Sequence, residues 1–258
     1  TNEHRRTGVG GAPDLNGDVI PDVIAGAPDY DNGLITLNGN NTYGGNTTVN
    51  AGILRFAGAT ASTPGGSIYV LGGATLQITD TASITTPASQ QVLIGHAASS
   101  GGAVVQSGGT LTVNGNSGAT YYRALSVAEY PTESSSYTMT GGTLNINNSG
   151  NFYLGWDGTG TMTVSNATVN ITGSLLMSGY GTSGSGTGAL ILNDGASFTV
   201  NGLVSVGNYN SRAATVTQNG GTFTSAASGW NFRIGHWPTE TSTYTLNGGS
   251  LSMVNGAF

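Results

Sequence analysis

The sequence has little charge and few large side chains. Charged residues make up 7% of the 258 residues and hydrophobic residues 37%, against roughly 25% and 45–50% in ordinary globular domains. Gly occupies 44 positions. Because Gly, Ser, Thr and Asn destabilise helices and favour strands and turns, this composition excludes a helical protein and predicts an all-β fold.

Lysine is absent, and the six basic residues are all Arg. The twelve carboxylates give a net charge of −6. Nucleic acid is therefore not expected as a partner, because phosphate binding needs clustered positive charge. Without Lys, Schiff-base chemistry and the P-loop ammonium are also excluded.

Cysteine and long apolar runs are absent as well. The first absence excludes disulfides and thiolate metal sites. The second predicts no membrane span in this chain, because a spanning helix needs about 18 apolar residues. The start, TNEHRRTGVGG, has no signal-peptide core. We expect a soluble chain, or a processed part of a larger protein.

The sequence does contain an internal repeat. A pattern of alternating apolar residues around a Gly-Gly turn recurs every 25 to 33 residues. Its copies are VVQSGGTLTV (104–113), YTMTGGTLNI (137–146), MTVSNATVNI (162–171), LILNDGASFTV (190–200), VTQNGGTFTS (216–225) and YTLNGGSLSM (244–253). Repeats of roughly 20 to 50 residues indicate solenoids, propellers or arrays.

The alternation places two apolar columns on the inner face of the repeats. The first contains Val104, Tyr137, Met162, Leu190, Val216 and Tyr244; the second contains Leu111, Leu144, Val169, Phe198, Phe223 and Leu251. A third apolar element precedes most copies, at 93–95, 153–155, 176–178, 204–207 and 233–235. A four-stranded propeller blade needs ~40 residues or more. A period of about 27 residues with three short strands is too short for such a blade. The sequence therefore predicts a right-handed parallel β-helix over 33–258, with about eight coils.

A column of hydroxyl residues follows the same period on the outer face. Its members are Thr110, Thr143, Thr168, Ser197, Thr222 and Ser250. β-branched hydroxyl residues stacked in this way pack well and exchange hydrogen bonds, so we expect a polar exterior that stabilises the sheet.

Residues 37–78 resemble the autotransporter-associated β-strand repeat. The matching positions are Asn41, Thr42, Tyr43, Gly45, Thr47, Val49, Asn50, Gly52 and Leu54. The resemblance covers one of the coils, and the later coils are similar to the divergent Gly-rich repeats of secreted bacterial surface proteins. It implies an extracellular β-solenoid passenger and by itself no catalytic activity, because folds carry sites rather than functions.

The N-terminal segment, 1–32, does not follow the repeat. Within it DLNGDVIPDVIAGAP (14–28) resembles the calcium-loop motif of FG-GAP repeats, although Val19 stands where the motif has Gly. The resemblance implies Ca²⁺ bound by Asp14, Asn16, Asp18, the carbonyl of Ile20, and Asp22. The segment would be a separate calcium-binding piece, an end cap, or a piece that docks on another subunit. The alternative is a solvated acidic turn without metal.

Two similar loops, EYPTESSSYTM (129–139) and HWPTETSTYTL (236–246), lie 107 residues apart. With the residues between them they predict an aromatic column along one corner: Tyr130, Trp156, Tyr180, Tyr209 and Trp237. Exposed aromatic side chains in line suit sugar rings or a protein partner. The alternative is that each ring covers its own loop and packs on the neighbouring coil.

The sequence gives little sign of catalysis. Carbohydrate-cleaving β-helices need paired carboxylates or a cluster of acids with Arg or Lys, yet the acids beyond residue 32 are scattered. Neighbouring coils could bring Glu129 or Glu133 near Asp157. His96 and His236 occupy equivalent places about five coils apart, too far to share a proton. We predict that the protein is not an enzyme and keep a carbohydrate-active β-helix as the enzymatic alternative.

A β-helix has two ends with unpaired backbone groups, which can add strands from another chain. This suggests head-to-tail stacking, which forms a filament when the contact does not close. We therefore expect an extracellular structural protein of a surface fibre or matrix, forming a homo-oligomer or filament through the β-helix ends. The alternative is an adhesin or glycan-binding surface module that uses the aromatic corner.

Overall fold

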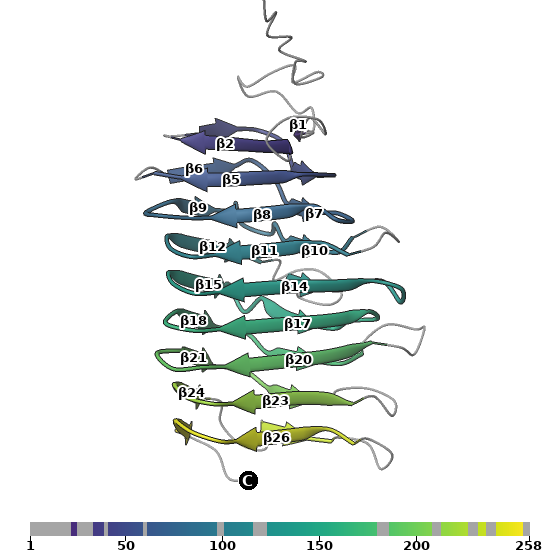
Figure 1. The fold of residues 1–258 in the computed structure, drawn as a ribbon, viewed down its shortest axis with the longest axis vertical. Helices are drawn as coiled ribbons and strands as arrows, with labels where there is room; N and C mark the ends of the chain where they lie inside the picture. The colour runs from purple at the N-terminus through teal and green to yellow at the C-terminus, as the bar shows by residue number, and fades with distance from the viewer. Residues whose placement is uncertain are drawn as a thin grey trace, which may run out of the picture.

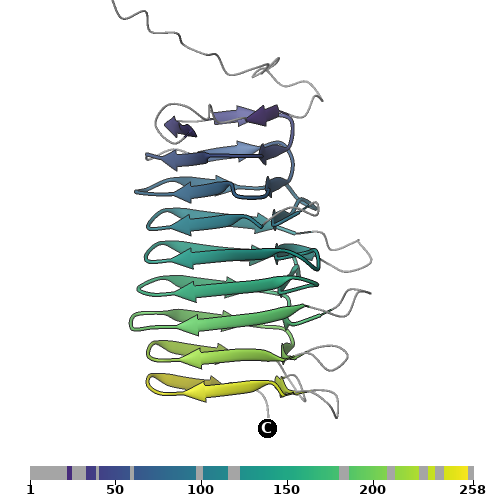
Figure 2. The ribbon, with the colours of Figure 1, turned by 45° about the vertical axis from the view of Figure 1, so that its right-hand side comes forward.

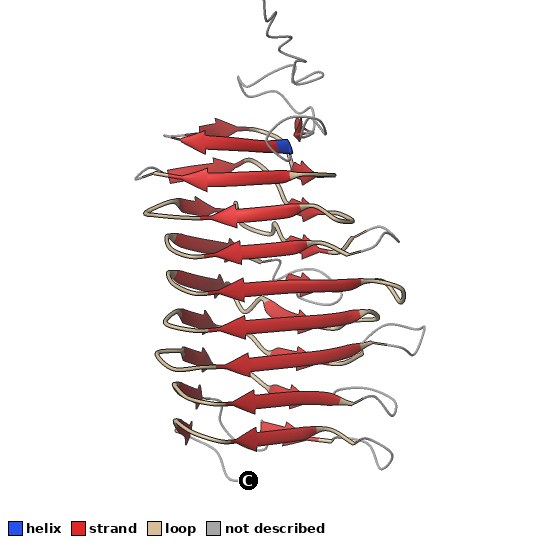
Figure 3. Ribbon diagram, in the orientation of Figure 1, coloured by secondary structure: helices blue, strands red, loops and turns tan. Residues whose placement is uncertain are grey.

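The computed structural model describes residues 22–24, 33–38, 41–58, 61–96, 101–115, 123–179, 186–207, 213–226, 232–235 and 241–254. These residues form a parallel β-solenoid with three strands in each coil, and Figures 1 and 2 show the coils stacked from the purple N-terminal end to the yellow C-terminal end. Figure 3 shows strands throughout, and its only helical segment is a short one before β2. No helix within these ranges is long and apolar enough to cross a membrane.

Each of the three sheets contains nine parallel strands, one from each coil. Sheet A consists of β1 (Asp22–Ile24), β4 (Thr47–Val49), β7 (Ile68–Val70), β10 (Val92–Ile94), β13 (Arg123–Val127), β16 (Asn151–Leu154), β19 (Leu175–Met177), β22 (Val204–Val206) and β25 (Phe232–Ile234). Sheet B consists of β2 (Leu34–Asn38), β5 (Ile53–Ala57), β8 (Thr75–Ile78), β11 (Ala103–Gln106), β14 (Ser134–Met139), β17 (Thr159–Val164), β20 (Thr187–Leu192), β23 (Ala214–Gln218) and β26 (Thr243–Leu246). Sheet C consists of β3 (Asn41–Tyr43), β6 (Ala61–Pro64), β9 (Ser83–Thr85), β12 (Thr110–Asn114), β15 (Thr143–Asn147), β18 (Thr168–Ile171), β21 (Ser197–Val200), β24 (Thr222–Ser225) and β27 (Ser250–Met253).

The predicted columns are confirmed residue by residue. In sheet B, Val104 pairs with Tyr137 and the column continues strand by strand to Tyr244. In sheet C, Leu111 begins the column that ends at Leu251, and the hydroxyl column beside it starts at Thr110. The apolar columns are continuous in one core along the solenoid axis, as the alternation predicts.

The predicted number of about eight coils is slightly too low, because each sheet has nine strands. The early coils are shorter than the repeat from which the count was made. Sheet B advances from Leu34 to Ile53 to Thr75, which is 19 and then 22 residues. These coils contain few loop residues, so a given length of chain forms more of them.

The N-terminal segment contributes one strand to the solenoid. Residues Asp22–Ile24 form β1, which pairs in parallel with β4 at the edge of sheet A. The other residues of the predicted calcium set, Asp14, Asn16, Asp18 and Ile20, lie outside the described residues, as does the side chain of Asp22. The calcium site therefore stays a prediction.

Two glutamines lie inside the solenoid, in a column that is otherwise largely apolar. Gln106 is fully buried, and its Nε2 donates to the carbonyl oxygens of Gly109 and Thr143, at 3.2 and 3.0 Å. The buried Tyr137 hydroxyl, one coil further on, donates to Gln106 Oε1 at 2.6 Å. The same arrangement recurs at Gln218, Gly221, Tyr244 and Ser250. Every polar atom of the two glutamine amides thus has a partner.

Candidate functional site on the outer face of sheet A

The outer face of sheet A is covered, in contrast to the outer faces of sheets B and C. Five outward-facing residues in register on successive strands are each buried: Leu93, Ser126, Tyr153, Leu176 and Ser205. Their counterparts on the other sheets, such as Thr138 and Thr112, stay partly exposed. Side chains therefore gather over sheet A, and the ionisable groups among them form the candidate site.

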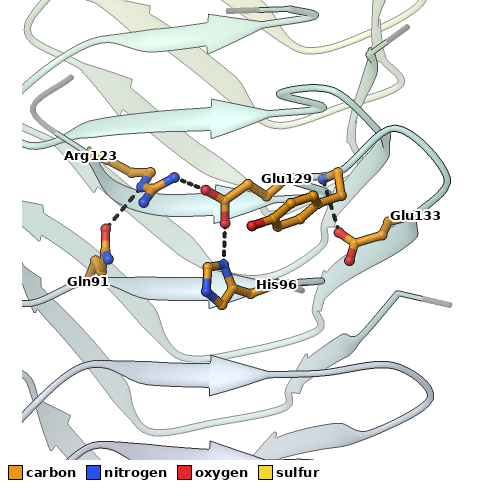
Figure 4. A network of polar contacts seen from close by, with 6 residues as sticks. Gln91, His96, Arg123, Glu129 and Glu133 are labelled. Carbon is orange, nitrogen blue, oxygen red and sulfur yellow. Dashed lines mark hydrogen bonds and ion pairs between the residues drawn. The ribbon is translucent and has the colours of Figure 1, made fainter. Parts of the chain in front are cut away.

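A chain of polar contacts crosses this face (Figure 4). Glu129 Oε2 accepts a hydrogen bond from His96 Nδ1 at 2.6 Å, and its Oε1 forms an ion pair with Arg123 Nη1. Arg123 Nε donates to Gln91 Oε1 at 3.0 Å. Next to this chain, Glu133 Oε2 accepts the backbone N–H of Tyr130 at 3.2 Å. Both oxygens of Glu129 are engaged, which fixes the orientation of its carboxylate and of the imidazole.

The corner that follows each strand of sheet A places these residues together. Ile94 pairs with Val127, and Val127 pairs with Leu154. The second residue after each of these strands therefore stacks in register, which brings together His96, Glu129 and Trp156. Between strand and corner stands a residue with positive φ, at Gly95 (73°), Ala128 (63°) and Gly155 (73°). This left-handed residue turns the chain out of the sheet and points the next side chain over its outer face.

Aromatic rings flank the polar chain on both sides. His96 stacks on Tyr69 with ring centroids 5.2 Å apart, and its edge meets Tyr130 at 5.9 Å. On the other side, the Arg123 guanidinium lies 5.4 Å from the Trp156 ring centroid. Trp156 in turn packs on Tyr153 at 4.5 Å. Rings on both sides restrict the rotamers of His96 and Arg123.

The predicted aromatic column is described at two of its five positions. Tyr130 is 36% exposed and lies at the edge of the site. Trp156 is only 8% exposed, because it packs in a small apolar cluster with Tyr153, Leu176 and Leu203. Trp156 thus packs as the alternative interpretation of the aromatic column expects. Tyr180, Tyr209, Trp237 and also His236 lie outside the described residues.

The strand on which the site depends was not predicted from the sequence. β13 (Arg123–Val127) was not recognised as the third element of its coil, and Glu129 was considered only as a partner for Asp157. Instead Glu129 contacts His96 and Arg123. A bulge at Ala124 disturbs the register of β13 with β16, and Ala128 stands where the corners directly before and after it have Gly. Two features of the sequence could have indicated this strand and its contacts. Leu125 and Val127 alternate as core residues do, and His96 and Glu129 each stand two residues after the end of their strands.

Ser126 Oγ is buried without a hydrogen-bond partner among the described residues, so it makes no nucleophile-to-base contact with His96. No group of three or more His, Asp or Glu that could hold a metal ion occurs in the described ranges. What the site presents outward is His96, whose side chain is 33% exposed, together with the half-exposed Tyr130.

Comparison of the chain with protein-family models, with curated proteins and with solved structures finds no match. The resemblances to the autotransporter-associated and FG-GAP repeats stay predictions, and the functional argument depends on the fold and the site.

Proposed function

We propose that the protein is a non-catalytic, extracellular structural protein: a β-solenoid subunit of a surface fibre or matrix that assembles head to tail. The observation that carries this proposal is the exposure of apolar side chains in the last described coil. There Ile234 is 42% and Leu246 is 50% exposed, whereas their register partners Val206 and Gln218 in the preceding coil are fully buried. The difference arises because each inner coil is covered by the next. A further coil would cover this apolar end.

The first coil has the complementary surface. Ile35 and Leu37 of β2 are partly buried and begin the two columns of sheet B that end at Tyr244 and Leu246. β2 and β26 are the edge strands of sheet B, each with one unpaired side in the described chain. If the first coil of one subunit covered the last coil of another, both columns would continue without a change of strand direction. A contact of this kind is heterologous and open, so it forms filaments.

A charge at the apolar end tests the assembly. Leu246→Glu places a carboxylate where the second subunit would pack, and we expect it to keep the chain as single subunits in sedimentation velocity runs over a hundredfold range of concentration. The control is Val105→Glu, because Val105 is also an exposed apolar residue, at 37%, but lies on the side of β11. This variant should assemble as the unchanged chain does. The proposal fails if the unchanged chain stays monomeric, or if both variants behave alike.

Calcium has a separate place in this proposal. We propose that Ca²⁺ binds Asp14, Asn16, Asp18, the Ile20 carbonyl and Asp22, and that it stiffens segment 1–32 where this segment meets the neighbouring subunit. Oxygen donors at alternating positions are the ligand type that Ca²⁺ prefers. Calorimetric titration with CaCl₂ should show one site that Asp18→Asn weakens at least about tenfold. Equal heats for the two proteins would contradict the calcium site without affecting the assembly test.

The second candidate function is a glycan-binding surface module, or adhesin. It is favoured by the exposed ring of Tyr130 beside the ordered His96 imidazole. A fibre subunit can also carry such a site, because the solenoid's side is free while its ends are stacked.

A further inference from the structure

We propose that the outer corner of sheet A binds an uncharged pyranose ring, with Tyr130 as the stacking platform and His96 Nε2 as a polar contact. The corner site is defined by Tyr69, His96, Arg123, Glu129 and Tyr130. This inference rests on the glycan-binding candidate function and is independent of head-to-tail assembly.

The ring surfaces provide the apolar part of such a site. Tyr69, His96 and Tyr130 come from three successive coils and follow one another along the solenoid axis, with centroids 5.2 and 5.9 Å apart. Tyr130 is 36% exposed and the His96 side chain 33% exposed, so solvent reaches both. A pyranose has an apolar face of C–H groups and a rim of hydroxyls. It therefore fits a surface that combines an aromatic ring with a few fixed polar atoms.

The polar part is a single, well-oriented imidazole. His96 donates from Nδ1 to Glu129, whose other oxygen pairs with Arg123, and Arg123 is itself held by Gln91 and the Trp156 ring. His96 Nε2 has no partner among the described residues. In the neutral imidazole this nitrogen accepts a hydrogen bond, which a sugar hydroxyl can donate. Side chains fixed before the ligand arrives lower the entropy cost of binding.

The charge of the corner selects the class of sugar. Its one guanidinium already pairs with Glu129, donates to Gln91 and lies on the Trp156 ring, so its charge is largely balanced before a ligand arrives. Arg123 balances the charge of Glu129, and the carboxylate of Glu133, which accepts the Tyr130 N–H, leaves the corner net negative, so a uronic acid is disfavoured. The corner is therefore matched to a neutral ring.

The backbone at this corner sets the direction of the chain after β13. Ala128 holds φ at 63° and is fully buried, in a place where the corners before and after it have Gly. A left-handed residue that is not glycine also follows β19, at Ser178 (60°), so this conformation recurs at the corners of sheet A. Here it fixes the direction in which the chain leaves β13, and with it the positions of Glu129 and Tyr130.

Immobilised neutral hexose oligosaccharides and uronic-acid oligosaccharides, probed with the full chain, test the proposal. We expect binding to neutral oligosaccharides only. Tyr130→Ala should weaken it at least about tenfold, whereas Tyr130→Phe, which keeps the ring, should bind within about twofold of the unchanged chain. His96→Phe, which keeps a ring and removes Nε2, should weaken binding about tenfold. Because Tyr130 is half-exposed, its variants should keep the circular dichroism spectrum and melting temperature of the unchanged chain.

Three results would overturn the proposal: no binding to any neutral oligosaccharide, stronger binding to uronic acids, or equal binding by Tyr130→Ala and Tyr130→Phe. Thr163→Ala on the outer face of sheet B is the control for a change elsewhere on the side of the rod. Sedimentation of the same samples measures their assembly, so the failure of the sugar site can be distinguished from the failure of the fibre proposal. A chain that forms rods and does not bind sugars contradicts only this inference.

Discussion

The most informative single residues are the buried glutamines, because a polar amide in an apolar column is tolerated only when all its atoms are paired. Gln106 occupies the column of Ile78 and Met139. Its amide donates to the Gly109 carbonyl in the turn between β11 and β12 and to the Thr143 carbonyl at the start of β15, and its own carbonyl accepts the Tyr137 hydroxyl. The pair thus connects two coils and a turn within the core. Its recurrence at Gln218 and Tyr244 shows that the two halves of the solenoid share this structure.

Replacing Gln106 by Leu should therefore lower the free energy of unfolding by about 2–3 kcal/mol, because it leaves the Tyr137 hydroxyl buried without an acceptor. The measurement is urea denaturation followed by circular dichroism. In a double-mutant cycle, Tyr137→Phe should cost less in the Gln106→Leu background than in the unchanged chain. Additive effects would contradict the claim that the two side chains depend on each other.

The buried tyrosines also predict how stability depends on pH. Burial raises the pKa of Tyr137, and that of the less buried Tyr244, above their usual value. A raised pKa means that the folded state holds a proton that the unfolded state loses above pH ~10. The contribution of these protonated tyrosines to the free energy of unfolding is thus complete below pH ~10. It declines as pH rises further, by up to about 1.4 kcal/mol per pH unit for each tyrosine.

Because the chain has no Lys and no Cys, tyrosines dominate its titration near pH 10. Urea denaturation at pH 8 to 11.5 should show this decline in the unchanged chain and a shallower one in Tyr137→Phe. The same slope in both proteins would contradict the role assigned to Tyr137.

At the scale of the elements, the turns between strands decide how closely the coils stack. Gly142 lies in the turn between β14 and β15 with φ at 82°. A Cβ there would lie 2.4 Å from the carbonyl oxygens of both Gly108 and Gly109 in the coil before. Gly73, between β7 and β8, has a similar φ of 75°, but nothing lies within 4 Å of its Cβ position. The two glycines share a backbone conformation and differ in the space around them.

This contrast predicts different costs for the same substitution. Gly73→Ala should lower the free energy of unfolding by about 1–2 kcal/mol, from the left-handed conformation alone. Gly142→Ala should cost about 1–3 kcal/mol more, because two backbone segments must move apart. Thermal or urea denaturation of the two variants measures the difference. Equal costs would show that the coils are not packed backbone to backbone at this turn.

The elements also show what the sequence could and could not predict. From residue 104 onward, sheets B and C were predicted almost residue by residue, because one face of each strand is buried and the alternation with Gly-Gly turns is regular. Sheet A was harder, since β10, β16, β19 and β22 are buried on both faces and do not alternate. β13 was missed because its bulge and Ala128 hide the Gly-ended pattern of its neighbours.

The site could be predicted only in part for the same reason. Tyr130 was recognised from the duplicated loop, and Glu129 was noted as an acid. The contact between Glu129 and His96 depends on the register of β13 with β10, and the burial of Trp156 depends on that of β16 with β19. Neither register follows from local periodicity once a strand is irregular. The buried glutamines were also overlooked, although a Tyr follows each of them one repeat later.

At the scale of the whole molecule, the proposed function assigns different roles to the sides and the ends of the solenoid. The sides carry the hydroxyl column of sheet C and the corner site of sheet A. The last described coil presents Ile234 and Leu246, in continuation of the inner columns. A stacked subunit would hide these side chains, while both sides would remain free.

The most direct test is cryo-electron microscopy of the purified chain at several concentrations. The account predicts unbranched rods of constant width in which strands follow one another every ~4.8 Å along the axis, and whose length increases with protein concentration. Particles of a single length at every concentration, without end-to-end contacts, would contradict it.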